Sequence, residues 1–362
     1  MNILYYLTIP PPEMPECDAV VQEVEALRTH FGGDIVYLNP NRHLPLRLPR
    51  VVFGIQRLSR VRNREPNLDI HHLFNPDLFP FPVLHALRRP IVYSLTGGVE
   101  DSHLDSRTCF QVFSRATRSF LASLAAITVA DERSLDRLRS WGLDNVILVH
   151  PGVDTTRFTC SPLPLQSEIK LMVGSAPWTR AQFQQKGIEA LLAAAQRSPR
   201  LRLVFLWRGV LADEMERRVR ERHLEKQVKV VNRRVNVNQV LAEVHASIAL
   251  ATNPAIIRPY PHSLMESLVA GKPVVVSRCI AMTDYVEQTG CGKIVEAVDP
   301  SDILDAIEAL VCKYESLQRA AQQVGQRDFP QQAMIASFHK VYDSVLETRR
   351  INTSIGNCKR TA

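Results

Sequence analysis

Short runs of apolar, β-branched residues alternate with amphipathic helical patterns along almost the whole chain, and this alternation limits the possible folds most strongly. Strand, helix and strand at this rhythm favour right-handed crossover connections and a mainly parallel sheet with helices on both faces. A proline-rich stretch, TCSPLPLQS at residues 159–167, interrupts the rhythm, which then starts again. The sequence therefore predicts an α/β protein of two doubly wound, Rossmann-like domains facing a cleft, with ligands at the carboxyl ends of the strands.

The apolar runs predict six strands in each half, at residues 2–9, 34–38, 68–74, 90–95, 125–130, 145–149, 169–173, 201–207, 228–231, 246–251, 273–277 and 292–295. In the first half, helical patterns between the strands cover residues 19–31, 51–64, 78–89, 108–121 and 132–142. We expect an N-terminal domain over 1–163, a second domain over 164–330, a helix at 331–350 that packs back on the first domain, and a frayed tail at 351–362. The last helix is predicted from an apolar stripe at Met334, Phe338, Val341 and Val345.

Composition places the chain among soluble globular proteins, with 362 residues, 45% hydrophobic and 22% charged. The longest nearly apolar run, at 120–130, falls short of the ~20 residues that span a bilayer. The N-terminus has neither a basic region nor a signal cleavage site. The seven scattered cysteines contain no C-x-x-C pair, which is typical of reduced thiols in a cytoplasmic protein. No residue spacing predicts a zinc site, so no metal is expected.

The net charge of +7 suits an anionic partner. Seven arginines and no acid lie between Arg42 and Arg64, where apolar residues recur at helical spacing. Such a helix can dock peripherally on an anionic membrane surface, or it can be an ordinary surface helix, and the sequence favours neither. No recognised nucleic-acid-binding module is present, so nucleic acid is not an expected partner.

Basic residues follow successive strands in the second half. Lys186 directly precedes a helical pattern, with Arg180 in the same loop, while Arg208 and Arg258 follow later strands. A lysine at a helix start opposes the helix dipole, and an anion bound between the lysine and the helix N–H groups would explain it. Their shared placement, together with two helix starts, favours a diphosphate ligand.

The stretch RPYPHSLMESLVAGKPVVVS, residues 258–277, contains the second of these helix starts. Ser263 and Glu266 have the S-x-x-E spacing of a capping box, which needs no ligand. A carboxylate at this place can also accept hydrogen bonds from a bound ligand. We expect Glu266 to serve both purposes.

The order of these motifs resembles a retaining glycosyltransferase of the GT-B fold, family 4. The segments that carry the resemblance are HPGVDTTRF at the domain junction, VGS…KGIEALLAAA, VNRRVNVNQVLAEVHASIALA, and the stretch that begins at Arg258. The likeness covers nearly the whole chain and is clearest from Ile147 to Val298. Two positions depart from the family: Arg258 replaces the first glutamate of its E-x7-E pair, and Thr96 stands where a histidine is common.

The resemblance implies a role for each matched residue. Glu266 would bind the ribose, Lys186 the diphosphate, and Arg180 would replace the loop arginine for which Ser175 stands. Arg258 would lie near the diphosphate or the donor sugar. The implied donor-binding set also contains Gly174, Ser175, Arg208, Arg234, Val235, His262, Ser263 and Leu264, and the implied acceptor side contains Thr96, Gly97 and Gly98.

The implied reaction is transfer of a sugar, with retention of configuration, from a UDP- or GDP-linked donor to a glycan or lipid-linked acceptor. The nucleotide sugar is a co-substrate, and no further cofactor is implied. The expected location is cytoplasmic, either free or peripheral on the inner face of the membrane, and the expected pathway is polysaccharide or glycolipid synthesis. Two alternatives remain open: a nucleotide-sugar epimerase on the same fold, and a degenerate glycosyltransferase-like protein that binds without turnover.

Overall fold

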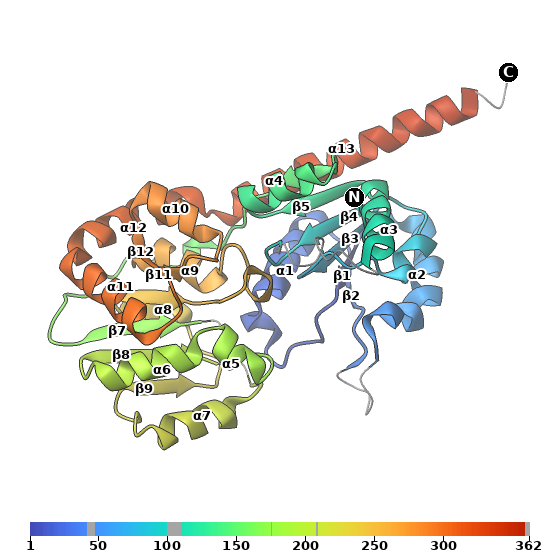
Figure 1. Cartoon of the computed structure of the whole chain (residues 1–362). Helices are drawn as coiled ribbons and strands as arrows, with labels where there is room; N and C mark the ends of the chain where they lie inside the picture. The colour runs from blue at the N-terminus through green and yellow to red at the C-terminus, as the bar shows by residue number, and fades with distance from the viewer. Residues whose placement is uncertain (42–47, 100–109, 175, 208, 359–362) are drawn as a thin grey trace. The chain divides into compact units, whose positions relative to one another are not determined.

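The computed structural model describes residues 1–41, 48–99, 110–174, 176–207 and 209–358, without the side chains of 110–114, 116 and 350–358. The chain forms two compact units (Figure 1). Unit 1 contains Met1–His150 and Gln332–Ala362, and unit 2 contains Pro151–Gln331. Among the described residues, no helix is both long enough and apolar enough to cross a membrane.

Unit 1 is built on a parallel six-stranded sheet in the order β2-β1-β3-β4-β5-β6. Its strands are β1 (Ile3–Leu7), β2 (Asp34–Tyr37), β3 (Ile70–Asn75), β4 (Ile91–Leu95), β5 (Ala126–Val129) and β6 (Val146–Leu148). Five of these strands lie within runs predicted from the sequence, and β3 extends one residue, Asn75, beyond its predicted run at 68–74. The strand order reverses at the β1–β3 pair, so the loops that follow these two strands border the place where such sheets bind ligands.

Helices cover both faces of this first sheet. They are α1 (Ala19–Phe31), α2 (Leu58–Arg64), α3 (Phe110–Ser123), α4 (Glu132–Ser140) and α13 (Gln331–Cys358). One face packs against α1 and α13, and the other packs against α2, α3 and α4. The Asp18 carboxylate starts α1 by accepting from two backbone N–H groups of its first turn.

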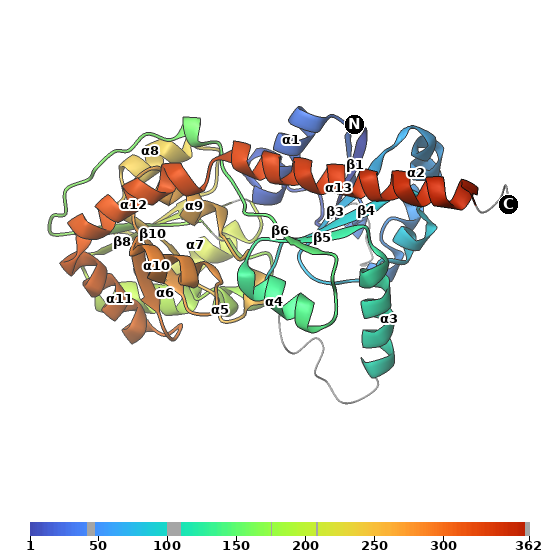
Figure 2. The ribbon, with the colours of Figure 1, turned by 90° about the horizontal axis from the view of Figure 1, so that it is seen from above.

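The helix α13 runs along the sheet of unit 1 (Figure 2). Phe338 and Tyr342 are buried in this contact, as the apolar stripe predicted. His72 of β3 lies beneath them, with its two ring nitrogens 2.7 Å from the hydroxyls of Tyr342 and Ser94. Burial lowers the pKa of His72 to about 3, so its imidazole is neutral and structural.

Unit 2 contains a second parallel sheet in the order β12-β11-β10-β7-β8-β9. Its strands are β7 (Ile169–Val173), β8 (Leu201–Leu206), β9 (Val228–Val231), β10 (Ala246–Ala249), β11 (Val274–Ser277) and β12 (Gly292–Val295). All six coincide with predicted runs. The strand order reverses at the β7–β10 pair, which makes the loops after β7 and β10 the expected ligand-binding loops.

The helices of unit 2 also form two layers. They are α5 (Ala181–Gln185), α6 (Ile188–Arg197), α7 (Ala212–Glu221), α8 (Val237–Ala242), α9 (His262–Val269), α10 (Met282–Thr289), α11 (Pro300–Cys312) and α12 (Tyr314–Asp328). The helices α5, α6, α7 and α11 share one core, while α8, α9, α10 and α12 share the other. The sequence reading did not predict α5, α10, α11 or α12.

Two predicted helices of unit 1 are wrong in part. The segment 51–64 consists of 3-10 turns at Arg50–Val52 and Ile55–Arg57 followed by the seven-residue α2, because Gly54 (φ +82°) breaks the helix. The segment 78–89 forms only a 3-10 helix at Pro82–Ala86. Prolines at positions 80 and 82 remove backbone donors and prevent a longer α-helix.

Candidate functional site

The candidate site of unit 2 lies at the carboxyl ends of β7 and β10, where the strand order reverses. Gly174 directly follows β7 and approaches the first turn of α9. A Cβ atom built on Gly174 would lie only 2.4 Å from the Cβ atom of Ser263. The loop after β7 and the start of α9 are therefore in contact, and only glycine permits this closeness.

Lys186 lies at the junction of two helices, α5 and α6. It ends α5, and Gly187 starts α6 with φ +64° in the left-handed region. The Lys186 side chain is 8% exposed, and its ammonium group donates to the Ala176 carbonyl over 3.2 Å. A buried cation thus lies between the loop after β7 and the start of α6, an arrangement suited to an anionic ligand.

The same junction contacts the loop after β10. The backbone N–H of Thr252 donates to the Gln185 carbonyl over 2.8 Å. A Cβ atom on Gly187 would lie 2.9 Å from the Cβ atom of Leu250. The loops that follow β7 and β10 therefore converge, although they are about 75 residues apart in the sequence (176 and 252).

Glu266 is buried in α9, with 7% of its surface exposed. The predicted capping box is wrong: the helix begins at His262, its N-cap is Pro261, and no side chain caps it. Ser263 consequently lies inside the first turn of α9, and its side chain is not the N-cap of the helix. Ser263 and Glu266 therefore do not hold the N-cap and N3 positions that a capping box requires.

Other predicted residues of the loop and helix differ in what they offer a ligand. Arg258 is half-buried in the loop after β10, and His262 and Ser263 are half-buried at the start of α9. Leu264 is fully buried in the core, and its N–H donates to the Pro261 carbonyl. The side chain and the backbone N–H of Leu264 are thus both engaged within the protein. Of the predicted donor-binding residues, Leu264 therefore has the least to offer a ligand.

The remaining predicted donor residues are more distant in the fold or lie outside the described part. Arg180 is exposed at the amino end of α5, five residues of helix away from Lys186. Burial, together with the charges of Arg222 and Arg180, lowers the pKa of Arg218 on α7. Arg234 and Val235 follow β9 at the end of the sheet. Ser175 and Arg208 lie outside the described residues.

In unit 1, the predicted acceptor residues Thr96, Gly97 and Gly98 follow β4. Thr96 is buried, and its N–H donates to the Asn75 carbonyl at the end of β3 over 2.8 Å. The two glycines lack the positive φ that would require glycine. They lie at the carboxyl edge of the sheet, next to the β1–β3 reversal.

A polar network at that reversal was missed by the sequence reading. The Thr8 hydroxyl donates to the Asn75 side chain, and the Asn75 amide donates to the Asp77 carboxylate over 2.9 Å. Both nitrogens of the Arg50 guanidinium bind this carboxylate, at 2.5 and 2.7 Å. Arg50 also stacks over Phe79, with 4.6 Å from its guanidinium carbon to the ring centre.

One signal in the sequence could have identified this network. Polar residues end both strands that flank the reversal, Thr8 after β1 and Asn75 in β3, but the strand order that joins them is a property of the tertiary structure. Arg50 belongs to the basic segment Arg42–Arg64, whose part at 42–47 lies outside the described residues. In the structure it is tied to the sheet edge instead of standing free on a surface helix.

The geometry of unit 2 agrees with a sequence comparison. Residues 178–327 match the family described as Glycosyl transferases group 1. The matched residues lie within unit 2. The chain is accordingly a transferase, and nucleotide-sugar binding belongs to this class. No protein of curated function matches the chain by sequence.

Solved glycosyltransferase structures share the fold of the whole chain. A complex of Anabaena Alr3699/HepE with UDP has a TM-score of 0.69 at 15% identity, covering 95% of this chain and 100% of that one. Sucrose-phosphate synthase from Thermosynechococcus elongatus has a TM-score of 0.73 at 15% identity, covering 96% and 100%. WaaG, a glycosyltransferase involved in lipopolysaccharide biosynthesis, has a TM-score of 0.65 at 12% identity, covering 93% and 98%. The expected GT-B fold is confirmed.

Among the described residues, no three His, Cys, Asp or Glu side chains are grouped so that they could hold a metal ion.

Proposed function

We propose that the chain transfers a sugar from a nucleoside diphosphate sugar to a glycan or lipid-linked acceptor, with retention of the anomeric configuration. One observation carries this proposal: the buried Lys186 ammonium lies between the loop after β7 and the start of α6, at the strand-order reversal of unit 2. The Anabaena protein of the same fold was solved with UDP, which favours UDP over GDP as the donor nucleotide.

In this proposal the diphosphate binds near Lys186 and the amino end of α6. The bond between the sugar carbon and the leaving phosphate oxygen breaks, and the acceptor oxygen bonds to that carbon on the same face. The acceptor proton moves to the leaving phosphate, so no protein base is needed. A buried cation and a helix start stabilise the charge that develops there, and neither a metal nor a cofactor is required.

Glu266 and Arg258 complete the proposed donor site. The Glu266 carboxylate, buried in α9 in the region that follows β10, accepts hydrogen bonds from the ribose hydroxyls. Charged hydrogen bonds of this kind contribute about 1.5–3 kcal/mol each. Arg258, half-buried after β10 at the position of the family's first glutamate, lies near the diphosphate and neutralises part of its charge.

The acceptor binds at the carboxyl edge of the first sheet in this proposal, near Thr96, Gly97 and Gly98. Exposed apolar residues in the basic segment favour a location at a membrane surface. Leu48, Val51 and Ile55 are 37%, 47% and 52% exposed and alternate with arginines. An amphipathic segment of this kind binds anionic lipid through apolar burial and charge together.

The proposal is tested first by calorimetry with UDP and GDP on the wild type and on Glu266→Gln. We expect UDP to bind, and the substitution to weaken binding about tenfold, or 1.4 kcal/mol, because one charged acceptor is lost. Ser301→Ala, at an exposed position near the amino end of α11, is a matched control. If the wild type bound neither nucleotide, the donor site would be wrongly assigned.

Product analysis then separates transfer from the two alternatives. Transfer releases free nucleoside diphosphate and a glycosylated acceptor whose anomeric configuration matches the donor. An epimerase would return a changed sugar still attached to the diphosphate. A protein that only binds would leave the donor unchanged with every acceptor tried.

A further inference from the structure

A groove of about 580 Å³ lies in unit 1 between the edge strand β2 and the helical segment Ile55–Arg64. Its floor contains the apolar side chains of Leu4 and Val36, and Val61 of α2 closes it from above. The groove does not involve the candidate donor site, which belongs to unit 2. It is a separate feature of the first sheet.

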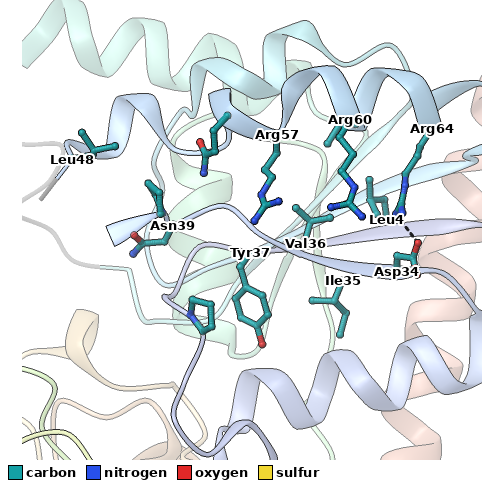
Figure 3. A pocket seen from close by; sticks show the side chains of 14 residues that line it. Leu4, Asp34, Ile35, Val36, Tyr37, Asn39, Leu48, Arg57, Arg60 and Arg64 are labelled. Atoms are coloured by element: carbon teal, nitrogen blue, oxygen red, sulfur yellow. Dashed lines mark hydrogen bonds and ion pairs between the residues drawn. The ribbon is translucent and has the colours of Figure 1, made fainter. Parts of the chain in front are cut away.

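Three arginines line this groove from one direction. Arg57, Arg60 and Arg64 have helical spacings of three and four residues, which place them on the same face of a helix. Figure 3 shows all three side chains extending from the helical segment toward β2. Three guanidinium groups and one carboxylate, that of Asp34, therefore line the groove, which leaves its described charged lining net positive.

Only one of these arginines has a described charge partner. Arg64 binds Asp34, the only acidic residue lining the groove, with 2.6 Å between Nη1 and Oδ2. Arg57 and Arg60 form no hydrogen bond or ion pair with any residue that the structure describes. Two guanidinium groups thus face the groove without a neutralising carboxylate.

The other described arginines of the segment Arg42–Arg64 differ from Arg57 and Arg60 in their surroundings. Arg50 is neutralised by Asp77, and Arg62 is exposed without lining the groove. Adjacent like charges on a helix repel each other, and an anion between them removes this cost. Arginine forks match the paired oxygens of a phosphate, which they bind in a bidentate manner.

We propose that this groove binds a phosphate group carried by the acceptor. The proposal rests on the proposed function for the identity of the ligand, but the phosphate site itself does not. Pro11 and Asn39 carry the groove to the carboxyl ends of β1 and β2, at the same sheet edge as Thr96. From β2 to β4 there are three strand spacings, so the phosphate would lie about 14 Å from the loop after β4.

The test uses calorimetry of the full chain with inorganic pyrophosphate as the probe. Arg57→Gln/Arg60→Gln is compared with Arg62→Gln, which removes a charge from the same helix outside the groove. We expect the double variant to weaken one binding event by roughly tenfold for each arginine removed, and Arg62→Gln to leave it unchanged. Arg57→Lys/Arg60→Lys keeps the charge without the fork and should give an intermediate loss.

A fourth variant, Lys186→Gln, separates this proposal from the proposed donor site. Loss of binding in the groove variant alone supports the groove and leaves the donor site unsupported. Loss in Lys186→Gln alone, with the groove variant unchanged in both pyrophosphate binding and the vesicle binding described below, overturns the groove proposal. Equal weakening by Arg62→Gln also overturns it, because the effect would then be one of general charge.

Vesicles of phosphatidylglycerol distinguish the source of the phosphate. If pyrophosphate binding depends on Arg57 and Arg60, the groove recognises the phosphate of a soluble or extended acceptor. If only vesicle co-sedimentation depends on them, the phosphate belongs to a lipid headgroup, which also supports the site. If neither depends on them, the proposal is wrong.

Discussion

The two units share one architecture, but they differ in how the cationic side chain near each strand-order reversal is neutralised. At the β1–β3 reversal of unit 1, Arg50 and Asp77 neutralise each other in a bidentate pair. At the β7–β10 reversal of unit 2, the buried Lys186 ammonium donates to a backbone carbonyl, and the next residue starts α6. A self-neutralised edge suits hydroxyl groups of a neutral ligand, whereas a cation at helix starts suits an anion.

The largest expected effect tests the unit 2 side of this comparison. Lys186→Met should reduce kcat for sugar transfer by roughly 10²–10³-fold, because it removes the preorganised charge at the leaving diphosphate. Arg180→Gln, at the exposed opposite end of α5, is the matched control and should lose far less. Steady-state kinetics with both variants measure the difference. Equal losses would show that the diphosphate lies along α5 and not at its junction with α6.

A second prediction concerns the buried bases of the two units. His72 in unit 1 has two hydrogen-bond partners, but the Nζ atom of Lys272 in unit 2 is fully buried with none among the described residues. Burial lowers the pKa of Lys272 from 10.5 to about 8. Below pH 8, Lys272 is protonated in both the unfolded and the folded state. The folded state then bears the full cost of removing this charge from water.

Lys272→Met should therefore raise the free energy of unfolding at pH 7 by something on the order of 3 kcal/mol. The gain should shrink as pH rises from about 8 toward 10.5, where both states lose the proton. Urea unfolding at pH 7, 9 and 10.5 measures it, with the exposed Lys226→Met as the control. A gain that does not change with pH would mean that packing, and not charge, is responsible.

Gly174→Ala tests how closely the loop after β7 must approach α9. The added Cβ atom would lie 2.4 Å from the Cβ atom of Ser263, so the loop or the helix start must shift. We expect a loss of about 1–3 kcal/mol in stability, as for other overpacked contacts, together with weaker UDP binding. Thermal unfolding and calorimetry measure both. Gly142→Ala is the control. Gly142 has a positive φ, and no atom lies within 4 Å of an added Cβ atom, so this variant measures backbone strain without a steric clash.

The smallest expected effect tests the unit 1 side. Arg50→Gln breaks a half-exposed pair with Asp77 and should cost only about 1 kcal/mol of stability. UDP binding should not change, because Arg50 belongs to unit 1. If the edge of the first sheet positions the acceptor, KM for the acceptor should rise while KM for the donor stays constant. A change in nucleotide affinity alone would contradict this division of roles.

The sequence was informative wherever a short-range pattern decides the structure. Eleven of the twelve strands lie within predicted runs, and β3 extends one residue beyond its run, because buried parallel strands require continuous apolar segments. The positions of Lys186 before a helix and Glu266 within one were also readable. The capping box at Ser263 was not, since Pro261 starts the helix two residues earlier than the box requires. The motif alone could not reveal that shift.

What the sequence by itself determined is the class of fold, the two repeats of strand and helix, and a basic set of loops in the second half. Only the tertiary structure decided which loops meet, because strand order is fixed by long-range pairing and leaves no local signature. It brought Gly174 against Ser263, and both Thr8 and Arg50 against Asn75. It also directed the side chains of Arg57 and Arg60 toward β2, an orientation that the order of charges along the chain could not predict.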